Sequence, residues 1–174
     1  VDSLDAPVRG GVWAAEDATL LIMCGGKKRA YDRALPVFQA MGNTIVHTGP
    51  AGSGQIAKAC HQLVVIATIE AVAEALALAE SWGADQTRIR EVMLAGHSAS
   101  PVLERQGQQI IDRSFDAGRP IEDYLKDSQS ISDALAGTQL RLPIGETVLA
   151  RVRDMVDAGK GHMKEASLYT LLTP

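Results

Sequence analysis

Residues 63–80 constrain the fold of this chain most strongly, because they form a nearly uninterrupted run of apolar side chains. On a helix, this run is hydrophobic around almost the whole circumference, which is typical of a largely buried helix. The run is also long enough to suggest a membrane span. Glu70 and Glu74 lie one turn apart near its middle, however, and carboxylates inside a bilayer are costly. We therefore expect a helix buried at a protein interface, and no membrane partner.

The sequence changes character near residue 50. Before that point, residues 5–8, 19–23 and 44–47 have patterns typical of strands, and residues 28–41 have a helical pattern. After Gly54 we expect only helices, at residues 55–82, 86–95, 101–112, 121–135, 144–157 and 165–172. The sequence thus predicts a mainly α fold class, with the remainder of an α/β layer at residues 1–50 and an all-α domain at 51–174.

Lys58 is the leading candidate for a catalytic residue. A glycine-rich entry at residues 49–54 leads into the long helix, on which Lys58, His61 and Gln62 stand at i, i+3 and i+4 and share one side. Burial beside the apolar run would lower the pKa of the lysine and make it a usable proton donor or acceptor. The alternative is that Lys58 extends to water and serves only solubility.

The glycines at 49, 52 and 54 also invite comparison with a dinucleotide-binding loop. Their spacing is reversed relative to G-x-G-x-x-G, and the chain stays helical where a second, acid-ended strand should follow, so we reject that interpretation. The glycines are better explained by close backbone approach at the start of the helix. The free amides of that helix start could still attract an anion.

Charge and cysteine content exclude several classes of protein. The net charge is −4 and the basic residues are dispersed, which disfavours nucleic acid as a partner. Cys24 and Cys60 fit no metal or redox spacing, and we expect buried, reduced thiols in a cytoplasmic protein. Glu70 and Glu74 have no histidine at a ligand spacing, so we expect no metal site.

Six segments of the chain form an ordered series of motifs. Residues 5–11 read D-A-P-V-R-G-G, with A-T-L at 18–20 and M-C-G-G at 23–26; residues 52–62 read G-x-G-x-x-x-K-x-x-H-Q, residues 125–127 L-K-D, and residues 161–167 G-x-x-x-E-A-S. This series resembles the motifs of the β-hydroxyacid dehydrogenases, the family of 3-hydroxyisobutyrate dehydrogenase, tartronate semialdehyde reductase and 6-phosphogluconate dehydrogenase. The resemblance covers essentially the whole chain.

The resemblance implies an NAD(P)-dependent oxidoreductase acting on a small anionic hydroxyacid or semialdehyde. Lys58 would exchange a proton with the substrate oxygen, and Lys126 and Asp127 would flank the cofactor. The first 50 residues would be the last strands and helix of a Rossmann-type domain, whose main NAD- or NADP-binding half would lie upstream of Val1 and be absent. We therefore expect the 174 residues alone to be inactive.

Two residues depart from the family pattern in the expected substrate site, which comprises Arg9, Gly10, Gly11, His61 and Gln62. Arg9 stands where the family has serine, and its guanidinium suits a larger or more strongly charged anion, such as a sulfonate, a phosphonate or a second carboxylate. Alternatively, Arg9 turns to solvent and the site is weakened. His61 replaces asparagine and can still donate a hydrogen bond to a substrate oxygen.

Two other functions stay open. The helical domain could be a noncatalytic oligomerisation module, although such a scaffold has no need of an amine at Lys58. An imine reductase shares the fold, but such relatives usually replace the lysine by a nonbasic acid. In either case the apolar run predicts a homodimer or homotetramer.

Overall fold

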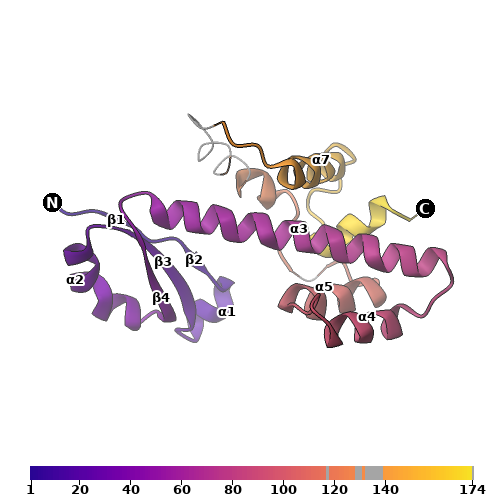
Figure 1. Ribbon diagram of the computed structural model, residues 1–174, viewed down its shortest axis with the longest axis horizontal. Coiled ribbons are helices and arrows are strands. Elements are labelled where there is room, and N and C mark those ends of the chain that lie inside the picture. Colours follow the sequence, from indigo (N-terminus) through magenta and orange to yellow (C-terminus); the bar gives the residue numbers. More distant parts are fainter. Residues whose placement is uncertain (117, 128–130, 132–138, 174) are drawn as a thin grey trace. The chain divides into compact units, whose positions relative to one another are not determined.

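The computed structural model describes residues 1–116, 118–127, 131 and 139–173. The chain divides into two compact units, and the division falls within one long helix, α3 (Ser53–Ser81), between His61 and Gln62. The first unit contains the strands and the helices α1 and α2, and the second contains α4, α5 and α7 (Figure 1). The expected domain boundary at residue 50 marks the end of the last strand and stays a prediction.

The first unit is built on a sheet whose central strand is β3 (Leu20–Gly26). Strands β1 (Leu4–Asp5) and β2 (Val8–Arg9) both pair antiparallel with β3, and one register runs through both. Pro7 lacks an N–H, but its carbonyl accepts a hydrogen bond of 3.0 Å from the Met23 amide. The two short strands therefore act as one interrupted strand, which carries the D-A-P-V segment along the edge of β3.

A β-α-β connection completes the sheet. Helix α2 (Lys28–Gln39) joins β3 to β4 (Gly42–Gly49), and the two strands are parallel. Leu20, Ile22 and Cys24 alternate along one face of β3 and pack with Tyr31 and Phe38 of α2 in a small core. This core fixes the sheet, and with it the strand edge that bears Val8 and Arg9.

The predicted mainly α fold class, with only the last strands and one helix of an α/β domain, is wrong. Residues 1–49 form a unit of four strands and two helices, which a helical domain follows. Helix α1 (Gly11–Glu16) was not expected, because it begins directly after Gly10 at a φ of 135°, and glycine pairs are normally taken to mark turns. The chain is therefore an α/β unit joined to a helical unit.

The helical unit follows the predicted order. Helices α4 (Gln86–Ala95), α5 (Pro101–Ile111) and α7 (Pro143–Asp157) confirm three of the expected segments. The segment Glu165–Leu171 is a 3₁₀-helix. In the expected helix at 121–135, residues 123–127 are helical, while 128–130 and 132–135 lie outside the described residues.

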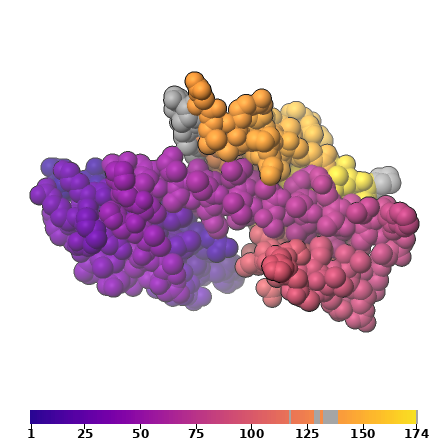
Figure 2. Space-filling view, in the orientation of Figure 1, coloured from indigo at the N-terminus to yellow at the C-terminus, as the bar shows by residue number. Residues whose placement is uncertain are grey.

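Helix α3 contributes apolar side chains to two clusters in the core of this unit. Ile66 and Ile69 pack with residues of α7, and Val72 and Leu76 pack with residues of α5. Within the single chain the helix is buried only in part, because Val64 and Leu78 expose 65% and 62% of their surface, and the expected burial at a protein interface stays a prediction. In the space-filling view, α3 is open to the viewer between α7 and the pair α4–α5 (Figure 2).

By length and composition, α3 is apolar enough to cross a membrane, with a mean hydropathy of 1.8 over its most apolar window. The core helix of a soluble protein passes the same test. Glu70 is 4% exposed and accepts a hydrogen bond of 2.9 Å from Nε of Arg151 on α7, so the carboxylate in the middle of the run is paired within the unit. The pairing ties α3 to α7.

Candidate active site

The start of α3 is held by a side chain from the strand edge. Oδ1 of Asp5 accepts a hydrogen bond of 2.7 Å from the amide of Gly52, and Oδ2 accepts one of 3.1 Å from the amide of Gln55. Burial alone raises the pKa of Asp5, but the hydrogen bonds from Gly52, Gln55 and Gly54 outweigh it and lower the pKa below the ordinary value. These amides therefore bind an internal carboxylate, where the sequence suggested that an external anion could bind.

Of the three glycines at the start of α3, Gly54 is required by close packing, as the sequence predicts, whereas a Cβ at Gly52 would meet no atom within 4 Å. A Cβ atom at Gly54 would lie 2.6 Å from the carbonyl oxygen of Met23 and 2.7 Å from that of Asp5. Since both contacts are to backbone atoms, a side chain at 54 would push α3 away from the sheet. The glycine-rich entry thus seats the first turns of α3 against the ends of β1 and β3.

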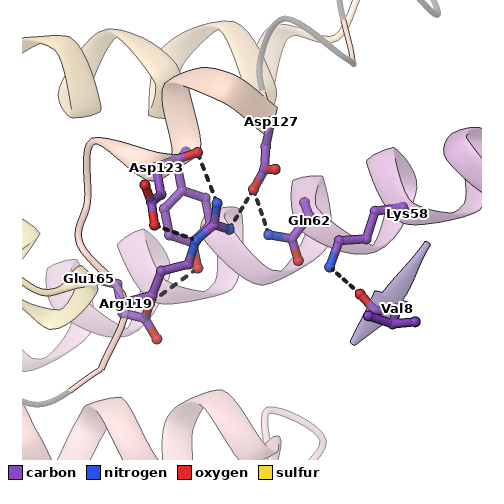
Figure 3. A network of polar contacts seen from close by, with 8 residues as sticks. Val8, Lys58, Gln62, Arg119, Asp123, Asp127 and Glu165 are labelled. Atoms are coloured by element: carbon purple, nitrogen blue, oxygen red, sulfur yellow. Dashed lines mark hydrogen bonds and ion pairs between the residues drawn. The ribbon is translucent and has the colours of Figure 1, made fainter. Parts of the chain in front are cut away.

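Lys58 lies one turn beyond this seat. Its Nζ donates a hydrogen bond of 3.0 Å to the carbonyl oxygen of Val8 in β2, and the side chain is half-buried (Figure 3). The amine is therefore directed to the strand edge by a backbone group, next to the expected substrate residues.

The segment after Val8 is exposed. Arg9, Gly10 and Gly11 are all open to solvent, and both glycines have positive φ, 135° and 68°. A Cβ at Gly11 would meet no atom within 4 Å, so a ligand can approach the backbone there closely. Arg9, which is exposed, directly precedes these two glycines.

His61 shares an environment with Lys58 and Arg9. Burial lowers the pKa of His61, and the positive charges of Arg9 and Lys58 lower it further. The imidazole is therefore neutral near pH 7 and has one nitrogen that donates and one that accepts. The first unit thus brings together an amine, a guanidinium and a neutral imidazole, a combination that attracts an anion and can exchange a proton with it.

Within the helical unit, Gln62 meets Asp127. Nε2 of Gln62 donates a hydrogen bond of 2.6 Å to Oδ2 of Asp127, and Gln62 is only 7% exposed (Figure 3). Lys126 is exposed, and no hydrogen bond of its side chain joins this pair. An exposed lysine amine of this kind suits a contact to a phosphate group.

Arg119 was not predicted from the sequence as a residue of the site. Its Nη1 donates to the same Oδ2 of Asp127 at 2.6 Å, and its Nη2 donates to the carbonyl oxygen of Asp123 at 2.9 Å. Burial alone lowers the pKa of Arg119, but the hydrogen bond and charge of Asp127, together with Tyr124 and Asp123, raise it above its ordinary value. The signal was present in the sequence, because Arg119, Asp123 and Asp127 follow one another at intervals of four residues.

Two further expectations concern metals and thiols. Over the described ranges, no group of three or more histidine, cysteine or acidic residues is placed to hold a metal ion. Cys24 is a buried free thiol as predicted, whereas Cys60 is exposed on α3, so the prediction of burial is wrong for Cys60.

Two family models match the chain. One, described as the NAD-binding domain of NADP-dependent 3-hydroxyisobutyrate dehydrogenase, matches residues 52–172, and the other, described as the NAD binding domain of 6-phosphogluconate dehydrogenase, matches residues 1–49. The expectation that the cofactor-binding half is absent is therefore wrong: residues 1–49 are themselves part of a nucleotide-binding domain.

Individual relatives agree with these models. The chain is 39% identical to the 2-hydroxy-3-oxopropionate reductase of Escherichia coli over 82% of this chain and 49% of that protein. It is 29% identical to the NAD-dependent L-serine dehydrogenase of Pseudomonas aeruginosa over 98% of this chain and 60% of that protein. The solved structure of Mycobacterium tuberculosis 3-hydroxyisobutyrate dehydrogenase with L-serine superposes with a TM-score of 0.90, at 29% identity, over 98% of this chain and 61% of that one. The chain thus spans about half to three fifths of the length of these relatives.

Proposed function

Because the chain belongs to the β-hydroxyacid dehydrogenase family, we propose that it acts as an NAD(P)-dependent dehydrogenase or reductase of small 3-hydroxyacids and their semialdehydes. The relatives bearing such names support the reaction class, and the positive charges of Arg9 and Lys58 support an anionic substrate. NAD and NADP both stay candidates for the cofactor.

Lys58 is the proposed proton carrier. The observation that carries this role is the hydrogen bond from its Nζ to the Val8 carbonyl, which holds the amine beside the exposed segment 9–11. When the hydroxyacid is oxidised, the amine accepts the hydroxyl proton as the C–H bond gives up a hydride; when the semialdehyde is reduced, the ammonium returns that proton to the carbonyl oxygen. The nicotinamide, when bound, accepts or supplies the hydride.

The neighbours of Lys58 have separate proposed roles. Arg9 pairs with the substrate's anionic group, aided by backbone amides of Gly10 and Gly11. His61, neutral at pH 7, hydrogen-bonds a substrate oxygen, and Gln62 supplies a further polar contact. Lys126 and Asp127 are the residues that would contact the cofactor. The alternative of an external anion bound by the start of α3 is disfavoured, because Asp5 occupies those amides.

The oligomeric state and the cellular location of the protein are also proposals. A groove of about 840 Å³ on the helical unit is lined largely by apolar residues of α3 and α7, including Val64 and Ile144, which expose 65% and 67% of their surface. Exposed apolar area of this kind is usually covered by a partner, so we propose a homodimer or homotetramer. We also propose a cytoplasmic protein with reduced cysteines.

The function is tested by a turnover assay of the protein. The panel comprises 3-hydroxyisobutyrate, L-serine and 2-hydroxy-3-oxopropionate, each with the oxidised or reduced form of NAD and NADP. We expect turnover of at least one substrate, followed by the absorbance of the reduced nicotinamide. Absence of turnover across the panel, in protein that binds nicotinamide and is folded, favours the alternative of a noncatalytic oligomerisation module. The prediction that the 174 residues alone lack turnover loses its basis, because residues 1–49 match a nucleotide-binding domain, and assaying the 174 residues by themselves tests it.

A further inference from the structure

Arg119 is held on several sides within the helical unit. Besides its hydrogen bonds to Asp127 and to the Asp123 carbonyl, its Nε lies 3.4 Å from Oδ2 of Asp123. Its guanidinium carbon lies 4.6 Å from the centroid of the Tyr124 ring, within cation–π distance. Tyr124 is 3% exposed and belongs to the core of the unit. The guanidinium therefore has a fixed position, set by the core and by the helical turn at 123–127.

Arg119 acts on Gln62 through one oxygen atom. Oδ2 of Asp127 accepts both from Nη1 of Arg119 and from Nε2 of Gln62, each at 2.6 Å. An ionised carboxylate only accepts hydrogen bonds, so the Gln62 amide must turn its NH₂ group toward Asp127 and its carbonyl oxygen away. The orientation of Gln62, one turn after Lys58 on α3, thus depends on where the Asp127 carboxylate lies.

Charge explains why Asp127 needs Arg119. Asp123 and Asp127 are separated by four residues on one helical turn, an arrangement in which like charges repel. The single guanidinium contacts both and offsets that repulsion. Without it, the Asp127 carboxylate loses one of the two contacts described above and is repelled by Asp123, so we expect it to rotate toward water.

We propose that Arg119 is a positioning residue, which holds Asp127 against the Gln62 side-chain amide and so fixes the orientation in which Gln62 meets the substrate. The substrate part of this inference rests on the proposed function, whereas the orientation of the amide does not. Arg119 itself touches neither substrate nor cofactor in this account.

The kinetic test is a double-mutant cycle in the protein. Arg119→Met removes the charge at similar length, and we expect kcat/KM for the hydroxyacid to fall about tenfold, as for loss of one hydrogen bond to a charged group. In a Gln62→Ala background, Arg119→Met should have almost no further effect, because its action passes through Gln62. Arg119→Lys should recover part of the loss. Independent, multiplying effects of Arg119→Met and Gln62→Ala would overturn the inference.

Arg88→Met is the matched control. Arg88 also pairs with a carboxylate of its own helix, Glu91, but the pair is exposed, so its loss should leave kcat/KM unchanged. An equal loss in Arg88→Met would show a general charge effect and contradict a specific role of Arg119.

A second readout does not depend on turnover. In protein labelled with ¹⁵N-glutamine, with the Gln62 side-chain signal identified by its absence in Gln62→Ala, Arg119→Met should shift the Gln62 Nε2 signal and speed the exchange of its protons. If the wild type has no turnover but this shift is seen, the proposed function fails while the positioning of Gln62 stands. An unchanged Gln62 signal in folded Arg119→Met overturns the positioning role itself.

Discussion

The two parts of α3, one in each unit, are held in different ways. In the first unit, Asp5 binds the amides of Gly52 and Gln55, and the Val8 carbonyl receives the Lys58 amine, so one partner in each contact is a backbone group. In the helical unit, the side chains of Arg119 and Gln62 both bind the side chain of Asp127, and Ile69 is fully buried in the core.

The difference bears on how each region tolerates change. A backbone carbonyl stays in place whatever side chain the strand carries, so the orientation of Lys58 is independent of the identity of residue 8. The Gln62 contact depends on the identity of two other side chains. We therefore expect substitutions near Lys58 to change chemistry and specificity more than folding, and substitutions around α3 in the helical unit to change folding and orientation.

The largest effect is expected in the core of the helical unit. Ile69→Asp places an unpaired charge at a position that is 0% exposed, which should cost more than about 4 kcal/mol and unfold this unit. Val64→Asp on the same helix is the matched variant, because Val64 is 65% exposed. It should keep the helical circular dichroism and dissociate the oligomer. Sedimentation velocity and thermal unfolding distinguish the two, and a Val64→Asp protein that stays assembled would argue against an interface on this face.

The next effect concerns the substrate anion. Arg9→Ser removes an exposed guanidinium beside Lys58 and His61, and the loss of a bidentate hydrogen bond should weaken kcat/KM for a sulfonate, phosphonate or dicarboxylate substrate about ten- to a hundredfold. A hydroxy-monocarboxylate should lose less. The measurement compares kcat/KM of the two substrate classes for the wild type and the variant. Equal losses in both classes would show that Arg9 faces solvent and does not select the anion.

The smallest effect concerns the seat of α3 on the first unit. Asp5→Ala removes the carboxylate that caps the helix and should lower the free energy of unfolding by about 0.5–2 kcal/mol. The folded-state pKa of Asp5 lies below its unfolded value of about 4, so its contribution is present above pH 4 and is lost as the pH falls through the folded-state pKa.

Chemical unfolding at pH 7 and pH 3 tests this capping role. The difference between wild type and Asp5→Ala should shrink at the lower pH. Asp5→Asn, which keeps one acceptor oxygen without the charge, should recover part of the stability at pH 7. A difference that is the same at both pH values would mean that the charge of Asp5 does not stabilise the helix start.

The sequence predicted best where a local pattern decides the structure. Helix α4 has the predicted bounds because Asp85 caps its first turn and Gly96 follows its end. At the start of α5, the hydroxyl of Ser100 caps the helix and accepts a hydrogen bond of 3.1 Å from the Leu103 amide. Lys58, His61 and Gln62 could be proposed as site residues because their helical spacing and the glycines before them are short-range signals, and their roles stay predictions.

The sequence predicted less of the structure where contacts between distant segments determine it. Composition did not show which faces of α3 are buried. Tertiary packing decides which faces meet α5 or α7, and it leaves Val64 and Leu78 exposed. The bond between Asp5 and the start of α3 joins residues 47 apart in sequence, and that between Gln62 and Asp127 joins residues 65 apart. Such contacts have no local pattern.

The most direct test of the account is the proton transfer assigned to Lys58. Lys58→Ala should lower kcat of the protein by roughly 10²–10⁴-fold, the loss expected for a general acid–base group, and added methylamine should restore part of the rate by supplying an amine in the vacated space. Lys28→Ala, which removes an exposed lysine paired with Asp32, should change kcat less than twofold. A Lys58→Ala enzyme that retains wild-type kcat would contradict the assignment and with it the central claim.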